Sequence, residues 1–222
     1  GLLYLEPHTS AMVIICGIGV IILLAGGMRL WYFAPILGLG AGAVAAFYVA
    51  FPHVRTRFEV WLNPFSDMAD KGLQGSMSQI AIGSGGIFGN GLFSGRYYSV
   101  PNAHNDFILS WMGNVIGFVG LCIVLGALLA LVIKTFATGA RSEDLLGSYI
   151  CAGIGGALMA QIAVNVGMNL RVLPVIGVTL PFYSAGGSSV LMLYICVGLV
   201  LSVYMHLSLI HISEPTRRSY IS

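Results

Sequence analysis

A histidine and an aspartate lie two residues apart, at His104 and Asp106, directly before a long apolar run. Only 8% of the 222 residues are charged, so an acid at this place needs an explanation. An aspartate or asparagine at the start of a helix commonly caps it, and either Asp106 or Asn105 suits that role. An ionisable side chain at a membrane boundary is equally a candidate functional group. The residues alone leave both interpretations of Asp106 open.

Basic side chains occur in the long polar connection that ends at Asp106 and in a second long polar connection further along the chain. They are Arg55, Arg57, Lys71, Arg96 and Arg171. Guanidinium groups bind phosphate through parallel hydrogen bonds, so cations that face one acid suit a phosphate-bearing substrate. Contact with lipid headgroups is the alternative explanation for such cations. His104 and Asp106 have no third metal ligand at a suitable spacing, so this pair alone does not predict a metal site.

The composition places these residues in a membrane protein. Soluble domains carry about 25% charged residues, whereas this chain carries 8% and is 57% hydrophobic. Its net charge of +2 is small and scattered, which argues against nucleic-acid binding. The apolar runs lack the strict alternation of a β-barrel. The four cysteines lie inside apolar runs and are interpreted as packing residues rather than disulfides or zinc ligands.

A membrane-spanning helix needs about 20 mostly apolar residues. Candidate segments occupy residues 11–25 (with a possible start at Thr9), 30–51, 107–133, 146–166 and 190–206. The sequence therefore predicts an all-α, polytopic membrane helical bundle of about five transmembrane helices. The connections at 26–29 and 134–145 are short, whereas those at 52–106 and 167–189 are long and share one side of the membrane. The basic residues alone would place the long connections in the cytoplasm.

Two glycine-rich stretches lie in these long connections. Residues 73–95, LQGSMSQIAIGSGGIFGNGLFSG, are too short and too glycine-rich to span, which favours a re-entrant or interface-lying segment of irregular backbone. They match no phosphate-binding loop, so close packing is the preferred explanation of their glycines. Residues 186–189, GGSS, open the last apolar run. The N–H groups of a helix start could receive an anion there, or the stretch could form a tight turn and cap.

Four stretches, in order along most of the chain, resemble the SEDS family of bacterial membrane proteins (FtsW, RodA and SpoVE). They are LEPHTSA from Leu5, RFEVWLNP through AIGSGGIFGNGL in the first long connection, PNAHNDFI from Pro101, and the second long connection at residues 165–189. The resemblance covers the C-terminal half of the family's membrane domain. It departs from the family's usual pattern at Asn102, at Met77 and at residues 113–117, which leaves fewer acids around Asp106.

The resemblance implies a peptidoglycan glycosyltransferase that polymerises lipid II at the outer face of the bacterial cytoplasmic membrane, in division, elongation or sporulation. It places both long loops outside the cytoplasm, against the charge count. It also implies a class B penicillin-binding protein transpeptidase as partner, besides lipid II and membrane lipids. A lipid II flippase and a non-catalytic scaffold for the transpeptidase are the alternatives. No cofactor is certain, although a divalent cation, Mg²⁺ or Mn²⁺, is possible at Asp106.

The resemblance also assigns roles to individual residues. It aligns the essential loop aspartate of the family with Asp106, which becomes the candidate catalytic base. The candidate substrate-binding residues are Arg57, Arg171, Lys71, Arg96, His104, Asn105 and Ser188. The basic members would stabilise a departing pyrophosphate, and His104 and Asn105 would orient the acid.

The two ends of the chain do not look native. The start lacks methionine and leads almost at once into an apolar segment, which indicates a fragment. Residues 207–218, LSLIHISEPTRR, interrupt the last apolar run and are interpreted as a translated sequencing adapter. The predicted organisation is a half membrane domain at 1–206, with its large extracytoplasmic loop at 52–106, and an artefactual tail at 207–222.

Overall fold

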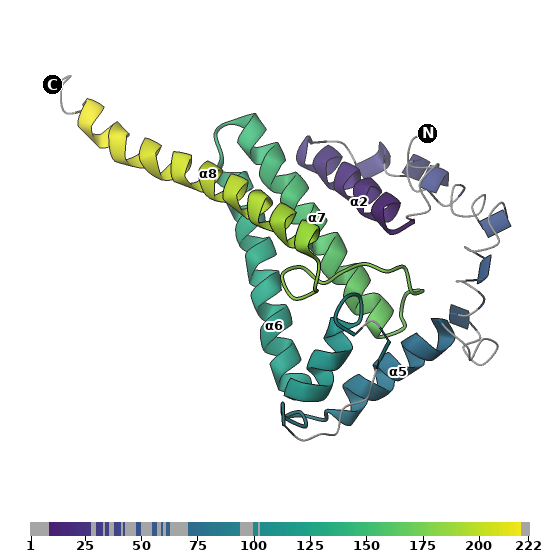
Figure 1. The fold of residues 1–222 in the computed structure, drawn as a ribbon. Coiled ribbons are helices and arrows are strands. Elements are labelled where there is room, and N and C mark those ends of the chain that lie inside the picture. Colours follow the sequence, from purple (N-terminus) through teal and green to yellow (C-terminus); the bar gives the residue numbers. More distant parts are fainter. Residues whose placement is uncertain are drawn as a thin grey trace.

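The computed structural model describes residues 9–27, 71–93, 100–101 and 103–218, together with short pieces between residues 30 and 62. All regular elements of these residues are helices (Figure 1). They are α2 (Thr9–Ala25), the short 3₁₀ helix η1 (Leu30–Tyr32), α5 (Lys71–Ser84), α6 (Ile108–Arg141), α7 (Leu145–Asn169) and α8 (Gly187–Arg218). The predicted all-α membrane class is confirmed.

Three of the described helices are long and apolar enough to cross a membrane, namely α6, α7 and the Gly187–Leu207 part of α8. Helix α2 begins at Thr9, the earlier of the two expected starts, and has 17 residues. At 1.5 Å per residue it is about 26 Å long, slightly less than the hydrocarbon core of about 30 Å. The span predicted at residues 30–51 lies largely outside the described residues, so the count of five stays a prediction.

The predicted end of the third span at residue 133 is wrong, because α6 continues to Arg141. Leu145 begins α7, and Asp144 caps it by accepting hydrogen bonds from the backbone N–H groups of Leu146 and Gly147 at 3.2 and 3.4 Å. The connection between α6 and α7 is therefore much shorter than residues 134–145. Helix α6 extends beyond its apolar stretch because helix formation depends on backbone propensity and packing, whereas the end at 133 was inferred from apolar character alone.

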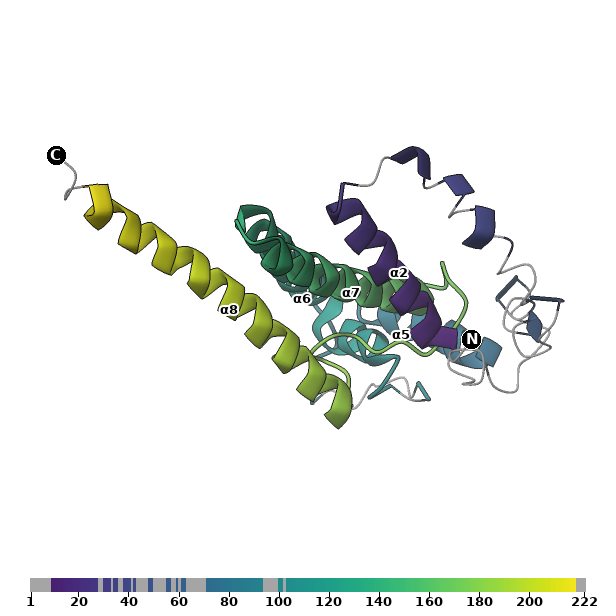
Figure 2. The same cartoon turned by 90° about the horizontal axis from the view of Figure 1, so that it is seen from above.

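Helix α7 packs between α2 and α6 and also contacts α8 (Figures 1 and 2). Small residues let these helices approach closely, as is usual in membranes. A Cβ on Gly156 would come within 2.7 Å of the Ile21 side chain in α2. A Cβ on Gly155 would come within 3.0 Å of the ring of Phe136 in α6. The glycines of α7 therefore fix its distance from both neighbours.

Helix α6 is broken at Gly117, whose φ of 69° and ψ of −171° are not helical. A break leaves backbone N–H and C=O groups without partners inside the helix. The turn at residues 85–91 supplies partners for them. Asn90 N donates to the Asn114 carbonyl, and Phe118 N donates to the Gly86 carbonyl, both at 2.9 Å. The turn thus completes the backbone hydrogen bonding of α6.

Glycines allow this turn to lie against α6. A Cβ on Gly85 or Gly89 would overlap backbone carbonyls of α6, so the interpretation of these glycines as packing residues is confirmed. The expectation of irregular backbone throughout residues 73–95 is wrong, because residues 71–84 form the regular helix α5. This helix is too short to span, as expected. Helix α5 contacts α6, and its Ala81 packs at the start of α6. These contacts stabilise α5 despite its glycine and serine content.

Helix α8 begins beside α6 and α7 and projects away from the other helices toward its C-terminal end (Figure 2). No residue of its most apolar window is buried. Its helical backbone continues to Arg218. The interpretation of residues 207–222 as an artefact stays a prediction.

Candidate active site

Asp106 lies in the turn at residues 103–107 that leads into α6. The N-cap position of α6 is Phe107, and no side chain caps the helix. Neither Asp106 nor Asn105 therefore performs the capping role that the sequence left open. The capping interpretation is therefore wrong, and the role of the Asp106 carboxylate as a functional group stays a prediction.

The segment between α7 and α8, residues 170–186, holds the backbone just before Asp106. Ala185 N donates to the His104 carbonyl at 2.8 Å, and Ser184 Oγ donates to the Asn105 carbonyl at 2.7 Å. Ser184 is itself buried and accepts a hydrogen bond from Leu180 N at 2.7 Å. Two successive carbonyls are thus fixed by a segment far along the chain.

The carbonyl of Asp106 is fixed by two asparagines of α7. Asn165 Nδ2 donates to it at 2.9 Å and Asn169 Nδ2 at 3.2 Å. Both asparagines are fully buried. Asn165 also donates to the Val178 carbonyl at 2.6 Å, and Ser78 Oγ of α5 donates to Asn169 Oδ1 at 3.1 Å. The backbone of Asp106 is therefore connected to α5, α7 and the segment before α8.

The carboxylate of Asp106 is half-buried and lies over Gly177. Gly177 has a φ of +79°, and a Cβ there would be 3.3 Å from Asp106 Oδ2. Burial raises the pKa of Asp106, because water stabilises the charged form less well there. Among the described residues, no donor hydrogen-bonds to this carboxylate. A carboxylate whose backbone is held in place and whose pKa is raised can, when ionised, accept a proton from a bound hydroxyl group.

Arg171 follows the C-cap residue of α7 and adopts a φ of +58°, which is uncommon for a residue other than glycine. Its side chain runs along α5, over Gly75, and Nη1 donates to Ser76 Oγ at 3.4 Å. Its carbonyl accepts a hydrogen bond from Trp61 Nε1 at 2.9 Å. It forms no ion pair with any acid that the structure describes. The side chain of Arg171 therefore packs against α5 and forms no hydrogen bond with Asp106.

The other predicted site residues are only partly placed. His104 is exposed, and Ser188 is exposed in the first turn of α8. Arg57 and Arg96 lie outside the described residues, and only the backbone of Lys71 is described. Within the part of the chain that the structure describes, no three His, Cys, Asp or Glu side chains lie together as metal ligands. The roles of these residues therefore stay predictions.

Sequence reasoning missed the polar side chains that hold the Asp106 backbone. These are Asn165, Asn169, Ser184 and Ser78. A signal for two of them was present, because Asn165 and Asn169 lie four residues apart on one face of an apolar helix. Polar side chains inside membrane helices are costly and mark functional or structural contacts.

Comparison with known proteins identifies the family. The chain matches the family described as "Cell cycle protein" (FTSW_RODA_SPOVE) over residues 1–209. It is 36% identical over 208 residues to a "Probable peptidoglycan glycosyltransferase FtsW" of Thioalkalivibrio sulfidiphilus, covering 91% of this chain and 52% of that protein. It is 35% identical over 181 residues to the "Peptidoglycan glycosyltransferase RodA" of Mycobacterium tuberculosis, covering 82% of this chain and 38% of that protein.

A solved structure agrees with these matches. It is described as "Structural coordination of polymerization and crosslinking by a peptidoglycan synthase complex" and superposes with a TM-score of 0.73 at 29% identity. The superposition covers 93% of this chain and 58% of that chain. The chain thus spans about half the length of the first curated relatives it matches. On these grounds the chain belongs to the FtsW, RodA and SpoVE family of cell cycle proteins.

Proposed function

We propose that the protein containing this chain is a peptidoglycan glycosyltransferase that polymerises lipid II at the outer face of the bacterial cytoplasmic membrane. The names of the FtsW and RodA relatives support the reaction class. The observation that carries the proposal is the half-buried carboxylate of Asp106. Its pKa is raised by burial, and its backbone is held by α7 and the segment before α8.

In the proposed reaction, Asp106 removes the proton from an acceptor sugar hydroxyl while that oxygen attacks the anomeric carbon of the donor. The bond between the anomeric carbon and the pyrophosphate oxygen breaks, and the polyprenyl pyrophosphate leaves with the electron pair. Attack from the opposite face inverts the anomeric centre. A raised pKa suits this role, because a base works best when its pKa lies near the operating pH.

Positive charge must stabilise the departing pyrophosphate. Among the candidate cations, Arg171 is the one whose side chain the structure describes. This side chain lies against α5, so it would have to turn away from Ser76 to reach the pyrophosphate. Arg57, Lys71 and Arg96 are further candidates from the first long loop, and Ser188 is a candidate anion contact at the start of α8. His104 and Asn105 contribute chiefly through backbone carbonyls, which hold the turn that carries Asp106.

A class B penicillin-binding protein transpeptidase is the proposed partner. The related solved structure concerns a complex of polymerization and crosslinking, which supports this choice. The proposed topology places the loops at 52–106 and 167–189 outside the cytoplasm, on the same side as Asp106.

The test is polymerisation of lipid II by the full-length protein with its partner, comparing wild type with Asp106→Asn. The substitution keeps the size of the side chain and removes the base. We expect glycan synthesis to fall by about two orders of magnitude or more, the range of general-base contributions. The control is Glu143→Gln, the same change from acid to amide at an exposed residue between α6 and α7. Undiminished synthesis by Asp106→Asn would contradict the base role, and transport without synthesis in wild type would favour a flippase.

A further inference from the structure

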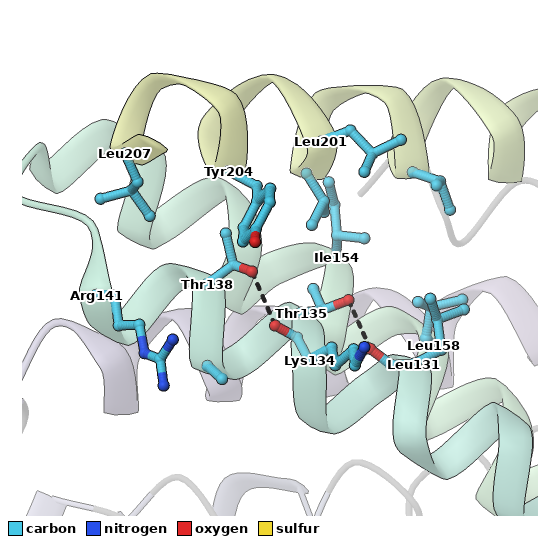
Figure 3. A pocket seen from close by; sticks show the side chains of 13 residues that line it. Leu131, Lys134, Thr135, Thr138, Arg141, Ile154, Leu158, Leu201, Tyr204 and Leu207 are labelled. Atoms are coloured by element: carbon cyan, nitrogen blue, oxygen red, sulfur yellow. Dashed lines mark hydrogen bonds between the residues drawn. The ribbon is translucent and has the colours of Figure 1, made fainter. Parts of the chain in front are cut away.

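A cavity lies at the other end of α6, far from Asp106. It has a volume of about 900 Å³, is partly open, and is lined by residues of α6, α7 and α8 (Figure 3). Its basic residue Lys134 is about 26 Å along α6 from Gly117, at 1.5 Å per residue. That distance approaches the thickness of the hydrocarbon core. The cavity therefore lies near the membrane surface opposite Asp106.

The walls of this cavity are apolar. Leu131 comes from α6, Ile154 and Leu158 from α7, and Leu201 from α8. Tyr204 points from α8 toward α6 (Figure 3). No residue in the most apolar window of α8 is buried by the other described residues. Such walls accept an acyl chain and would not hold a soluble anion on their own.

Two basic side chains stand on the α6 side of the cavity. Lys134 and Arg141 are exposed and seven residues apart, about two helical turns, and therefore lie on the same helix face. Neither forms an ion pair with an acid of the described residues, and no acid lines the cavity. Glu143 and Asp144 line a smaller adjoining cavity of about 170 Å³, where Asp144 caps α7. The large cavity thus combines apolar walls with two unpaired positive charges.

We propose that this cavity binds one anionic phospholipid from the leaflet opposite Asp106. An acyl chain lies between α8 and the α6–α7 pair, against Leu158 and Leu201. The phosphate lies between Lys134 and Arg141, whose long side chains reach it from the helix surface. Basic pockets between transmembrane helices are suited to anionic headgroups. The lipid fills the space that α8 leaves open and links it to α6 and α7.

The test is native mass spectrometry of the full-length protein released from mixed phosphatidylglycerol and phosphatidylcholine nanodiscs. Wild type is expected to retain one phosphatidylglycerol. In the Lys134→Gln, Arg141→Gln double variant, retention falls roughly thirtyfold, from the loss of two charges near an anionic surface. Ala137→Phe keeps both charges but adds a ring at the lining, and it also loses the lipid. Arg55→Gln, the matched charge control outside the cavity, retains it.

Thermal melting gives a second measurement. Phosphatidylglycerol is expected to raise the melting temperature of wild type and Arg55→Gln but not that of the double variant, because a ligand stabilises the state that binds it. Equal retention by wild type and the double variant overturns the proposal, as does an absence of bound lipid in wild type. If the double variant loses the bound lipid but Ala137→Phe retains it, the lipid lies outside the cavity, which also overturns the proposal. An equal effect of inorganic phosphate overturns the lipid assignment.

Discussion

Replacement of Asn165 by leucine is expected to impair the proposed polymerisation by loosening Asp106. Asn165 is fully buried, and its Nδ2 donates to the carbonyls of Asp106 and Val178. Leucine has a similar shape but no donor. The Asp106 carbonyl keeps its hydrogen bond from Asn169 at 3.2 Å, whereas the Val178 carbonyl loses the donor that the structure shows.

The expected loss of stability follows from these contacts. A buried carbonyl left without its donor costs about 1–3 kcal/mol, and the second hydrogen bond contributes about 1 kcal/mol. The sum is roughly 2–4 kcal/mol. The effect on rate is of similar size, because a displacement of about 1 Å at a reacting group can cost about a hundredfold, or roughly 2.7 kcal/mol. A loosened turn also exposes Asp106 to more water, so the raised pKa of its carboxyl should fall toward the ordinary value.

Asn114→Leu provides a matched control. Asn114 is as deeply buried as Asn165, but its Nδ2 donates to Ser84 Oγ at 2.6 Å and to the Ala81 carbonyl at 3.4 Å, away from Asp106. Its Oδ1 has no hydrogen-bond partner among the described residues. Ser84 Oγ still donates to the Ala81 carbonyl after the substitution. The substitution removes an unsatisfied polar atom along with two hydrogen bonds, one of them long at 3.4 Å, and leaves no carbonyl without a donor, so the free energy of unfolding should fall by only about 1 kcal/mol.

The assay is lipid II polymerisation per folded molecule, measured against pH, with melting temperature measured in parallel. We expect Asn165→Leu to lower kcat roughly a hundredfold with little change in KM, and to shift the acidic limb of the pH profile to lower pH. Asn114→Leu should leave both unchanged. Equal rates and equal pH profiles for the two variants would show that Asn165 has only a structural role.

The remaining predictions concern Asp106 and two glycines of α6. As a base, Asp106 must be ionised, so polymerisation should rise with pH through its raised pKa. Because the pKa of Asp106 is higher in the folded state than in the unfolded state, the protonated carboxyl group favours folding. This contribution to the free energy of unfolding is fully present below the ordinary pKa and is lost as the pH rises through the raised pKa of the folded state. Asp106→Asn should therefore raise the melting temperature at neutral pH but not in acid; an equal shift at both would contradict this. Gly117→Ala should prevent stable folding, because its Cβ would overlap the turn at 85–91. A Cβ on Gly126 would meet open space, so Gly126→Ala should stabilise α6 by up to about 1 kcal/mol. Similar melting temperatures for the Gly117→Ala and Gly126→Ala variants would refute the packing argument.

The sequence predicted the helices wherever apolar character and helix bounds coincide. The bounds of α7 agree closely with the predicted segment 146–166. The predicted helix bounds were wrong where packing and backbone propensity, rather than apolar character, determine the extent of a helix. Helix α6 extends past its apolar core, and α5 forms from a glycine-rich stretch because it packs against α6. The role of Asn165 could not be predicted, because it donates to a carbonyl 59 residues away in the sequence.

Composition and residue order alone determined that this chain belongs in a membrane, because the free energy of transferring each segment into lipid depends on its own side chains. They also determined that Asp106 is an acid at the edge of such a segment. Only the tertiary structure determined the environment of that carboxyl group. Its burial, its position over Gly177, and the carbonyls held by Asn165 and Ser184 all depend on contacts between segments distant along the chain. Those contacts exist only once α6, α7 and the segment before α8 have packed together.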